Sequence, residues 1–432
     1  MRILLIHTQY LPAINPNVFR WSAIAMYWVQ QGHDVHVMCT RRSGTKHDMV
    51  LNGVHVHRVG HASLLDMIYN IINARKRRGE VGGETLAKKG KWRQILEKMM
   101  DISWRNIYWP DGSCVWYIAG KKKAFSLHKQ YHYDAIISIT QPFTPHLIAA
   151  ALKKRFPAIR WVMDIEDPFS FVNEIFINNR KLYKQYNYQK EGQLFTLADK
   201  VSVTVEAARQ RYLQYFPQLS NKIVVTPPLY TTPEVVNEFI KEPGYIHLGY
   251  FGAFYNPIRT PDALLALLHQ ISQNSSDIPL ILHFFGEIPP VFQPIFQHYQ
   301  TILPNLRLHG LVTRAHAAAA MEAMDFLVNV GNTTDYHLPS KCVDYIMSAK
   351  PIIHLSYCKN DPFTDFLADY PLILTLDITS AVNNYMIQEM ITFIKVYHGK
   401  RVEQAYVEKL IQPYTLEVIA GQYFNLLQTS VE

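Results

Sequence analysis

The chain has 432 residues, of which 48% are hydrophobic and 18% charged, and its formal net charge is +8. This composition can supply cores for about two or three domains, and no apolar run approaches the roughly 18 residues of a membrane span. The opening segment MRILLIHTQYLP is too short for a secretory signal peptide and is expected to be a first buried strand. The four cysteines form neither a metal-type pair nor a disulfide framework, which favours a reducing, cytoplasmic setting: Cys39, Cys114, Cys342 and Cys358.

Residues 1–226 alternate between apolar strands and helices. The expected strands are RILLIHT, DVHVMCT, YDAIISIT, IRWVMDIED, LADKVSVTV and KIVVTPPLY, and the expected helices include VFRWSAIAMYWVQQG and HLIAAALKKRF. Strands that alternate with helices predict a parallel sheet covered on both faces, here as an N-terminal α/β domain.

A basic insertion is predicted within this domain, at about residues 63–130. Residues 71–130 hold 14 Lys and Arg against 5 Asp and Glu, whereas the rest of the chain has 29 basic and 30 acidic residues. Apolar residues recur there at helical spacing between the basic ones: Trp92, Ile95, Leu96, Met99 and Ile102. A basic amphipathic helix with tryptophans is typical of an anionic membrane surface element. The alternative is an ordinary helix packed on its own domain with a solvated basic face. A charge confined to one segment does not indicate a nucleic-acid binder.

Residues 227–244 are rich in proline and have little apolar periodicity, which predicts a linker. The α/β pattern restarts over 245–412, with strands YIHLGYFG, LILHFFG, LRLHGLV, MDFLVNVG and PIIHLS separated by helices such as PDALLALLHQIS and AHAAAAMEA. The predicted fold is therefore two doubly wound, Rossmann-like domains facing an interdomain cleft, with ligands at the carboxyl ends of the strands. Residues 413–432 are expected to form a C-terminal helix that crosses back to the N-terminal domain.

Two basic side chains of the second half stand beside predicted helix starts. Arg259 precedes Thr260-Pro261-Asp262, a strong helix start that follows a strand ending at Gly252. Lys341 follows Ser340, the expected N-cap of the helix VDYIMSA. Either cation alone could be a solvated surface charge. Two of them at helix starts after strands of one sheet favour a shared diphosphate, which uses both N–H groups and cations.

Asp344 lies three residues beyond Lys341, on the same stripe of that helix. A carboxylate one turn from a phosphate site can accept hydrogen bonds from two ribose hydroxyls. The alternative is a plain Lys–Asp helix pair, worth a few tenths of a kcal/mol, roughly, in stability.

The whole chain resembles retaining GT-B glycosyltransferases of the glycosyltransferase family 4 type, in the branch that acts on surface polysaccharides. DYIMSAKP resembles the E-A-M-A-x-G-K-P run of that family, PSK precedes it, and Gly252 to Arg259 resembles the G-x-L…K-G diphosphate loop. In the first half, FRWSAIAMYWVQQGHDVHVMC, YDAIISITQPFTPHLIAAALKK and WVMDIEDPF are similar to further segments of that branch.

The resemblance implies that the C-terminal domain binds a nucleotide-diphospho-sugar through Gly252, Arg259, Ser340, Lys341 and Asp344. Lys341 and Arg259 would stabilise the departing diphosphate, without a metal ion or another cofactor. The N-terminal domain would bind a glycan or lipid-linked acceptor for polysaccharide or lipopolysaccharide synthesis, on the cytoplasmic face of the membrane. Asp167, at the end of a strand with Asp164 and Glu166, is the candidate for contacting an acceptor hydroxyl; a helix cap before Pro168 is its alternative.

The sequence also departs from the family pattern. Tyr336 stands where the family often has a second glutamate, Glu166 replaces an arginine, and LPAINPNV has none of the glycines usual after the first strand. Two other functions therefore remain open: a nucleotide-sugar epimerase of the same fold, and a non-catalytic partner in polysaccharide assembly.

Overall fold

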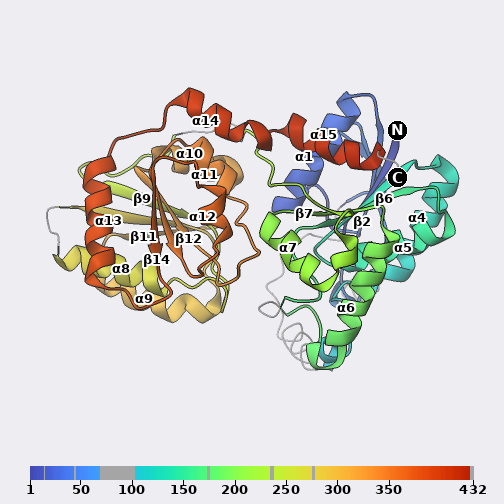
Figure 1. The fold of residues 1–432 in the computed structure, drawn as a ribbon, viewed down its shortest axis with the longest axis horizontal. Coiled ribbons are helices and arrows are strands. Elements are labelled where there is room, and N and C mark those ends of the chain that lie inside the picture. The colour runs from blue at the N-terminus through green and yellow to red at the C-terminus, as the bar shows by residue number, and fades with distance from the viewer. Residues whose placement is uncertain are drawn as a thin grey trace, which may run out of the picture. The chain divides into compact units, whose positions relative to one another are not determined.

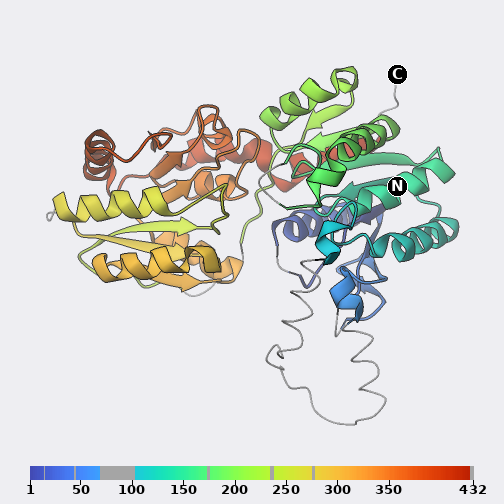
Figure 2. The same ribbon diagram turned by 90° about the horizontal axis from the view of Figure 1, so that it is seen from below.

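The computed structural model describes residues 1–13, 15–42, 45–68, 103–172, 176–233, 238–274 and 278–428. They form two compact units: Met1–Thr226 with Ile419–Glu432, and Pro227–Val418 (Figures 1 and 2). The predicted helix around Trp92 lies outside the described residues. None of the described helices is both long and apolar enough to cross a membrane.

The first unit contains an eight-stranded sheet in the order β3-β4-β2-β1-β5-β6-β7-β8. Its strands are β1 (Arg2–Ile6), β2 (Asp34–Cys39), β3 (Asp48–Leu51), β4 (Val54–Arg58), β5 (Ala135–Ile139), β6 (Arg160–Ile165), β7 (Lys200–Val203) and β8 (Ile223–Val225). All neighbouring strands are parallel except β3 and β4. These two form a hairpin that the sequence analysis did not include. Its turn is Asn52-Gly53, where both residues have positive φ, as a tight hairpin turn requires.

Helices cover this sheet. They are α1 (Pro16–Gln30), α4 (Trp116–Tyr131), α5 (Thr144–Arg155), α6 (Arg180–Leu197) and α7 (Glu206–Tyr215), with 3-10 turns at Trp104–Asn106 and Pro217–Leu219. Helix α4 packs beside α5, and Trp116 is fully buried and donates a hydrogen bond to the Val59 carbonyl, 2.8 Å away. The predicted insertion therefore extends too far, because its last part is an ordinary helix of the α/β pattern.

The last helix, α15 (Leu416–Gln428), packs against α1 within the first unit. The Trp28 indole donates to the Ala420 carbonyl at 3.2 Å, and the Tyr423 hydroxyl donates to the buried carboxylate of Asp164. Arg20 bonds the Tyr423 hydroxyl at 3.0 Å, so the buried carboxylate has a cation nearby. Asp164 is thus an internal residue, although it belongs to the same group of three acidic residues as the candidate Asp167.

The second unit contains a six-stranded, fully parallel sheet in the order β11-β10-β9-β12-β13-β14. Its strands are β9 (Ile246–Phe251), β10 (Leu280–Phe285), β11 (Leu306–Gly310), β12 (Phe326–Val330), β13 (Ile352–Ser356) and β14 (Ile373–Asp377). The predicted class, two Rossmann-like α/β domains, is confirmed by the two sheets.

Helices lie on both faces of the second sheet (Figure 1). They are α8 (Asp262–Asn274), α9 (Gln293–Ile302), α10 (Arg314–Ala323), α11 (Cys342–Met347), α12 (Pro362–Phe366), α13 (Asn384–Tyr397) and α14 (Gln404–Ile411), with 3-10 turns at Pro290–Phe292 and Gln412–Tyr414. One apolar core joins the sheet to α8, α9 and α13, and a second joins its other face to α10, α11, α12 and α14. Leu248 and Tyr250 enter the first core and Phe251 the second, as alternation along a strand requires.

A buried carboxylate on α6 holds the loop that follows β6. Glu191 is fully buried and accepts hydrogen bonds from the Ser170 N–H at 3.1 Å and the Tyr212 hydroxyl at 2.9 Å. Burial raises the pKa of Glu191 to about 7, although these hydrogen bonds act in the opposite direction. Asp167 lies at the start of the loop that Glu191 fixes.

We expect Glu191 to make stability depend on pH. Its pKa is higher in the folded chain than the ordinary 4.5, so the folded state binds more protons between these values. The contribution of Glu191 is therefore complete below about pH 4.5 and is lost as pH rises through about 7. Urea unfolding between about pH 5 and 8 should show that Glu191→Gln loses less stability than the parent as pH rises. The exposed Glu206→Gln serves as the control and should follow the parent. Parallel curves for the parent and Glu191→Gln would contradict this assignment.

Candidate functional site

The carboxyl ends of β9 and β10 meet at two glycines. The Gly252 N–H donates to the Phe285 carbonyl at 2.9 Å, and a Cβ at Gly286 would lie 1.9 Å from the Gly252 carbonyl oxygen. Only glycine fits so close to another backbone, so Gly286 fixes the point from which the loop after β9 leaves the sheet. The sequence analysis named Gly252 but not its partner, although the residue stands at the end of the predicted strand LILHFFG.

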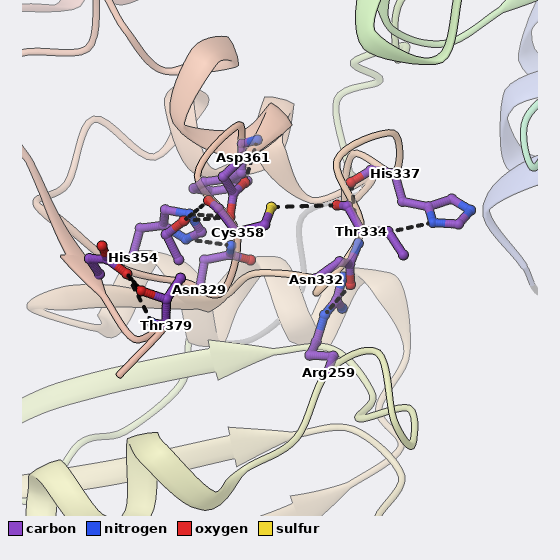
Figure 3. A network of polar contacts seen from close by, with 12 residues as sticks. Arg259, Asn329, Asn332, Thr334, His337, His354, Cys358, Asp361 and Thr379 are labelled. Carbon is purple, nitrogen blue, oxygen red and sulfur yellow. Dashed lines mark hydrogen bonds and ion pairs between the residues drawn. The ribbon is translucent and has the colours of Figure 1, made fainter. Parts of the chain in front are cut away.

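Arg259 joins the loop after β9 to the loop after β12. Its own backbone pairs with Tyr255 in both directions, at 2.7 and 2.9 Å, which closes the loop between them. The Arg259 Nε donates to the Asn332 Oδ1 at 3.1 Å, and the Thr333 N–H donates to the Ile258 carbonyl at 2.8 Å. Figure 3 shows the Arg259 side chain, from the loop after β9, pointing toward Asn332 in the loop after β12. Two loops that are 73 residues apart in sequence are thereby fixed to each other.

The loop after β12, residues 331–341, is held by polar side chains. Asn332 Nδ2 donates to the His337 carbonyl at 3.2 Å, and the Thr334 hydroxyl lies 2.8 Å from the His337 Nδ1 (Figure 3). Tyr336 is buried and lies against the His337 ring, with centroids 4.4 Å apart. The aromatic residue in the family's acidic position therefore fills the loop interior.

A buried hydrogen-bond network around Asp361 adjoins the start of this loop at Gly331. The Asp361 carboxylate bonds the His354 Nε2 and the Ser356 hydroxyl, each at 3.1 Å, and caps α12 through the Phe363 N–H at 2.8 Å (Figure 3). Burial alone would raise the pKa of Asp361, but these hydrogen bonds lower it below the ordinary value. A Cβ at Gly331 would lie 2.5 Å from the Asp361 Oδ2, so the first residue of the loop also has to be small. No periodic pattern in the sequence marked Asn332 or Asp361.

Helix α11 begins one residue later than predicted. Ser340 is exposed and does not cap it; Lys341 occupies the cap position with helical φ and ψ and makes no side-chain cap bond. The backbone bond from the Cys342 N–H to the Pro339 carbonyl at 3.1 Å turns the chain into the helix instead. The helix has six residues, so its dipole is small, and the electrostatics of this position rest on side chains.

Lys341 and Asp344 meet on the surface of α11. The Lys341 Nζ lies 3.2 Å from the Asp344 Oδ2, with the two side chains 33% and 20% exposed. This contact is the intrahelical pair that the sequence analysis considered as an alternative. The pair also lines a pocket of about 120 Å³, so it remains accessible to a ligand.

The rest of the pocket comes from α10 and the segment after β8. Its lining is Tyr230, Pro233, Arg314, Ala318, Met321, Glu322, Lys341, Asp344, Met347 and Ser348. Arg314 also donates to the Thr231 carbonyl, which ties α10 to this segment. Burial, with Asp344 nearby, raises the pKa of Tyr230. Of the predicted donor-site residues, the structure places Lys341 and Asp344 in this lining. Arg259 contacts the loop 331–341 through Asn332, Gly252 contacts the end of β10, and Ser340 is exposed outside the lining.

A second pocket, of about 300 Å³, lies in the first unit at the carboxyl ends of β1, β5 and β6. It is lined by Thr8, Gln9, Ala62, Tyr108, Asp111, Gly112, Ser113, Thr140, Gln141, Pro142, Phe143, Pro168, Phe169, Phe176 and Ile177. Phe143 and Phe169 stack with centroids 3.8 Å apart, and the buried Asp111 accepts from the Thr144 N–H and hydroxyl at 2.8 Å. Asp167 is half-buried immediately before this lining. No helix begins at Pro168 in the described loop 166–172, so Asp167 is not a helix cap there.

Neither a protein-family model nor a curated protein sequence matches this chain. Solved structures do match it over their full lengths. Sucrose-phosphate synthase from Thermosynechococcus elongatus has a TM-score of 0.63 at 13% identity, with 98% of each chain covered. WaaG, a glycosyltransferase involved in lipopolysaccharide biosynthesis, has a TM-score of 0.58 at 10% identity, with 99% of this chain and 100% of WaaG covered. HepE of Anabaena, in complex with UDP and glucose, has a TM-score of 0.54 at 13% identity, with 99% of each chain covered.

These similarities extend over both units. At such low identities they establish the fold alone. The chain therefore has the GT-B glycosyltransferase fold, similar to that of glycosyltransferase family 4.

Proposed function

We propose that this chain transfers a sugar from a nucleotide-diphospho-sugar to a glycan or lipid-linked acceptor, with retention of anomeric configuration. The observation that carries the proposal is the pocket beside α11, where a cation, Lys341, and a carboxylate, Asp344, share one lining. Both residues stand at the start of the helix that follows β12, and this start lies at the carboxyl edge of a parallel sheet. That edge is where doubly wound sheets bind nucleotides. The HepE structures with UDP and glucose, and with UDP-glucose, support a nucleotide-sugar as the donor.

The pocket residues have complementary roles in this proposal. Lys341 would exchange its contact with Asp344 for a phosphate oxygen, and Asp344 would then accept hydrogen bonds from the ribose hydroxyls. Arg259 would join Lys341 at the diphosphate. In the reaction, the bond from the anomeric carbon to the diphosphate breaks, a bond to an acceptor oxygen forms, and the acceptor hydroxyl loses its proton. Fixed cations stabilise the negative charge that the departing diphosphate gains.

The pocket of the first unit suits an acceptor. Its aromatic side chains, Tyr108, Phe143, Phe169 and Phe176, offer apolar surface, and Gln9 and Ser113 add polar groups to the same lining. Small-molecule sites combine such apolar surface with a few polar groups that fix orientation. Asp167, at the start of the loop that contains Phe169, is our candidate for the residue that contacts the reacting hydroxyl. The similarity to WaaG supports a surface polysaccharide or lipopolysaccharide acceptor.

A non-catalytic partner in polysaccharide assembly is the second candidate, and one observation favours it. Tyr336, at the position where the family often has a glutamate near the donor sugar, is buried against His337. Such a protein would bind the nucleotide and leave the sugar in place. A nucleotide-sugar epimerase of the same fold would convert the donor into its epimer, with the nucleotide still attached, and would need no acceptor. Product analysis with and without acceptor separates the three functions.

Lys341→Ala and Arg259→Ala should each weaken binding of a nucleoside diphosphate and abolish sugar transfer. Loss of one charge-assisted contact costs about 1.5–3 kcal/mol, on the order of a ten- to hundredfold change in dissociation constant. A thermal-shift screen of nucleotide-sugars identifies the donor, because a bound ligand raises the melting temperature. Calorimetric titration of that donor then compares the variants. Lys359→Ala, which changes an exposed lysine of the same unit, should bind as the parent does. Parent-like binding by both test variants would place the diphosphate elsewhere.

Asp344→Asn should weaken nucleotide binding, whereas Asp344→Glu should retain part of it. The amide replaces one acceptor oxygen with a donor, so it can no longer accept hydrogen bonds from two hydroxyls. The same titration measures both variants, with Asp365→Asn, an exposed acid on α12, as the control. For a 2′-deoxy nucleotide, which lacks one of the two hydroxyls, the difference in affinity between the parent and Asp344→Asn should be smaller. If Asn binds as well as Asp, Asp344 is only the partner of Lys341.

The basic segment should attach the enzyme to anionic membranes, which would bring a lipid-linked acceptor to it. Each Lys or Arg near such a surface contributes about 1 kcal/mol, and the attraction weakens with salt. Lys123 already contacts Asp48 at 3.0 Å, so the test variant leaves it in place. Replacement of Arg75, Lys76, Arg77, Arg78, Lys121 and Lys122 by Gln should abolish co-sedimentation with anionic vesicles at low salt. Replacement of the exposed Lys181, Lys184 and Lys359 should not. If the parent protein does not co-sediment with anionic vesicles at low salt, the proposed membrane attachment is wrong and the acceptor is a soluble one.

A further inference from the structure

Three histidines and two aspartates gather where β2 and β4 begin, at the edge of the first sheet opposite to the pocket. His36 and His55 face each other in the parallel pairing of these strands, and their rings stack with centroids 4.6 Å apart. His36 is buried, whereas the side chains of His55 and Asp34 are 42% and 40% exposed. Neither the donor pocket nor the acceptor pocket includes any of these residues.

Three polar contacts link two carboxylates through two imidazoles. Asp34 Oδ1 lies 3.0 Å from His36 Nε2, His36 Nδ1 lies 3.0 Å from His57 Nε2, and His57 Nδ1 lies 2.6 Å from Asp48 Oδ1. Each contact needs one hydrogen between its two atoms, but two neutral imidazoles carry only two N–H groups. One of the three contacts therefore lacks a hydrogen, and a proton or a metal ion is needed between its two atoms.

A second row of histidines in the other sheet has no such deficit. His247 Nε2 lies 2.8 Å from the Glu242 carbonyl, His247 Nδ1 lies 2.8 Å from His283 Nε2, and His283 Nδ1 lies 2.9 Å from His309 Nε2. Three neutral imidazoles carry three N–H groups, one for each contact. Stacked histidines on neighbouring strands are thus satisfied when a single acceptor ends the row, and the second carboxylate creates the shortage around His36.

The geometry locates the shortage at Asp34. The contact of His57 with Asp48 is the shortest of the three, which assigns an N–H to it, and Lys123 Nζ, 3.0 Å from the same Asp48 oxygen, compensates the charge of that carboxylate. At the other end, His36 Nε2 and Asp34 Oδ1 remain as two facing lone pairs. His55 Nε2 lies 3.9 Å from that Asp34 oxygen, and one ligand atom each of Asp34, His36 and His55 lies within 4.8 Å of the others. A proton between His36 Nε2 and Asp34 Oδ1 would leave the His55 nitrogen without a role, whereas a metal ion could bind all three residues.

We propose that Asp34, His36 and His55 bind one divalent metal ion of the zinc type. Two imidazole nitrogens and one carboxylate oxygen are ligands that Zn²⁺ prefers, and the exposed side of His55 and Asp34 leaves room for water as the fourth ligand. His57 and Asp48 form the second shell that orients the buried ligand, His36. Arg2 Nε, 3.6 Å from the other Asp34 oxygen, holds the carboxylate in place. The ion would join β2 to β4 and stabilise this edge of the sheet.

The test uses full-length protein without a histidine tag, treated with a chelator and then titrated with Zn²⁺ in competition with a chromophoric chelator. The parent should bind one equivalent, and Co²⁺ in its place should give the visible absorption of a nitrogen- and oxygen-ligated ion. His55→Ala should weaken binding at least tenfold and remove the Zn²⁺-dependent rise in melting temperature. Because the His55 side chain is 42% exposed and has no buried hydrogen-bond partner among the described residues to leave unsatisfied, the metal-free variant should melt close to the metal-free parent.

Two further variants make the test specific. Asp34→Asn removes a ligand charge and should also weaken Zn²⁺ binding at least tenfold. His298→Ala changes an exposed histidine of the second unit and should bind Zn²⁺ as the parent does. The proposal is overturned if the parent binds no equivalent of Zn²⁺, or if His55→Ala and Asp34→Asn both bind it as tightly as the parent.

Discussion

The contact between the backbones at Gly252 and Gly286 is the constraint on which the donor side of the molecule depends. It fixes where the loop after β9 starts, and the backbone pairing of Tyr255 with Arg259 then returns that loop toward the sheet. Arg259 donates a hydrogen bond to Asn332, so the position of the loop after β9 determines that of the loop after β12. The second loop ends at Lys341, which contacts Asp344 on the helix that follows. A side chain at residue 286 would displace this whole series. The cations of the site are thus positioned by backbone packing two strands away.

Most of the fold could be predicted from the sequence because its strands are short apolar runs between helices, and this pattern fits a parallel sheet. The hairpin of β3 and β4 was missed although VLNGVHVHR contains the Asn-Gly turn signal, since the alternation around it is polar on one side. The start of α11 was placed one residue early for a different reason. Ser340 is a favourable cap by type, but the Pro339 carbonyl already accepts the first N–H, so no hydroxyl is required.

Burial was the property that sequence reasoning could not supply for the acidic residues. Asp164 and Asp167 are three positions apart, yet one is enclosed by Trp21 and Tyr423 and the other is half-buried at the surface. The difference arises from α15, which lies more than 250 residues further along the chain and brings Tyr423 to Asp164. Local composition around WVMDIED contains no sign of that helix. The proximity of Lys341 and Asp344 was easier to predict, because it depends only on spacing within one helix turn.

The two histidine rows show how the same local pattern leads to different chemistry. In each row, the bonded histidines lie on neighbouring parallel strands and are two positions out of register, so they share one face of the sheet, where their rings stack and their nitrogens meet. In the second unit the row ends on a carbonyl, and neutral imidazoles satisfy it completely. In the first unit, carboxylates stand at both ends, and hydrogen bonding among neutral groups leaves one contact without a hydrogen. The aspartates at the ends, more than the histidines between them, therefore decide whether such a row is a neutral structural element or a place for a cation.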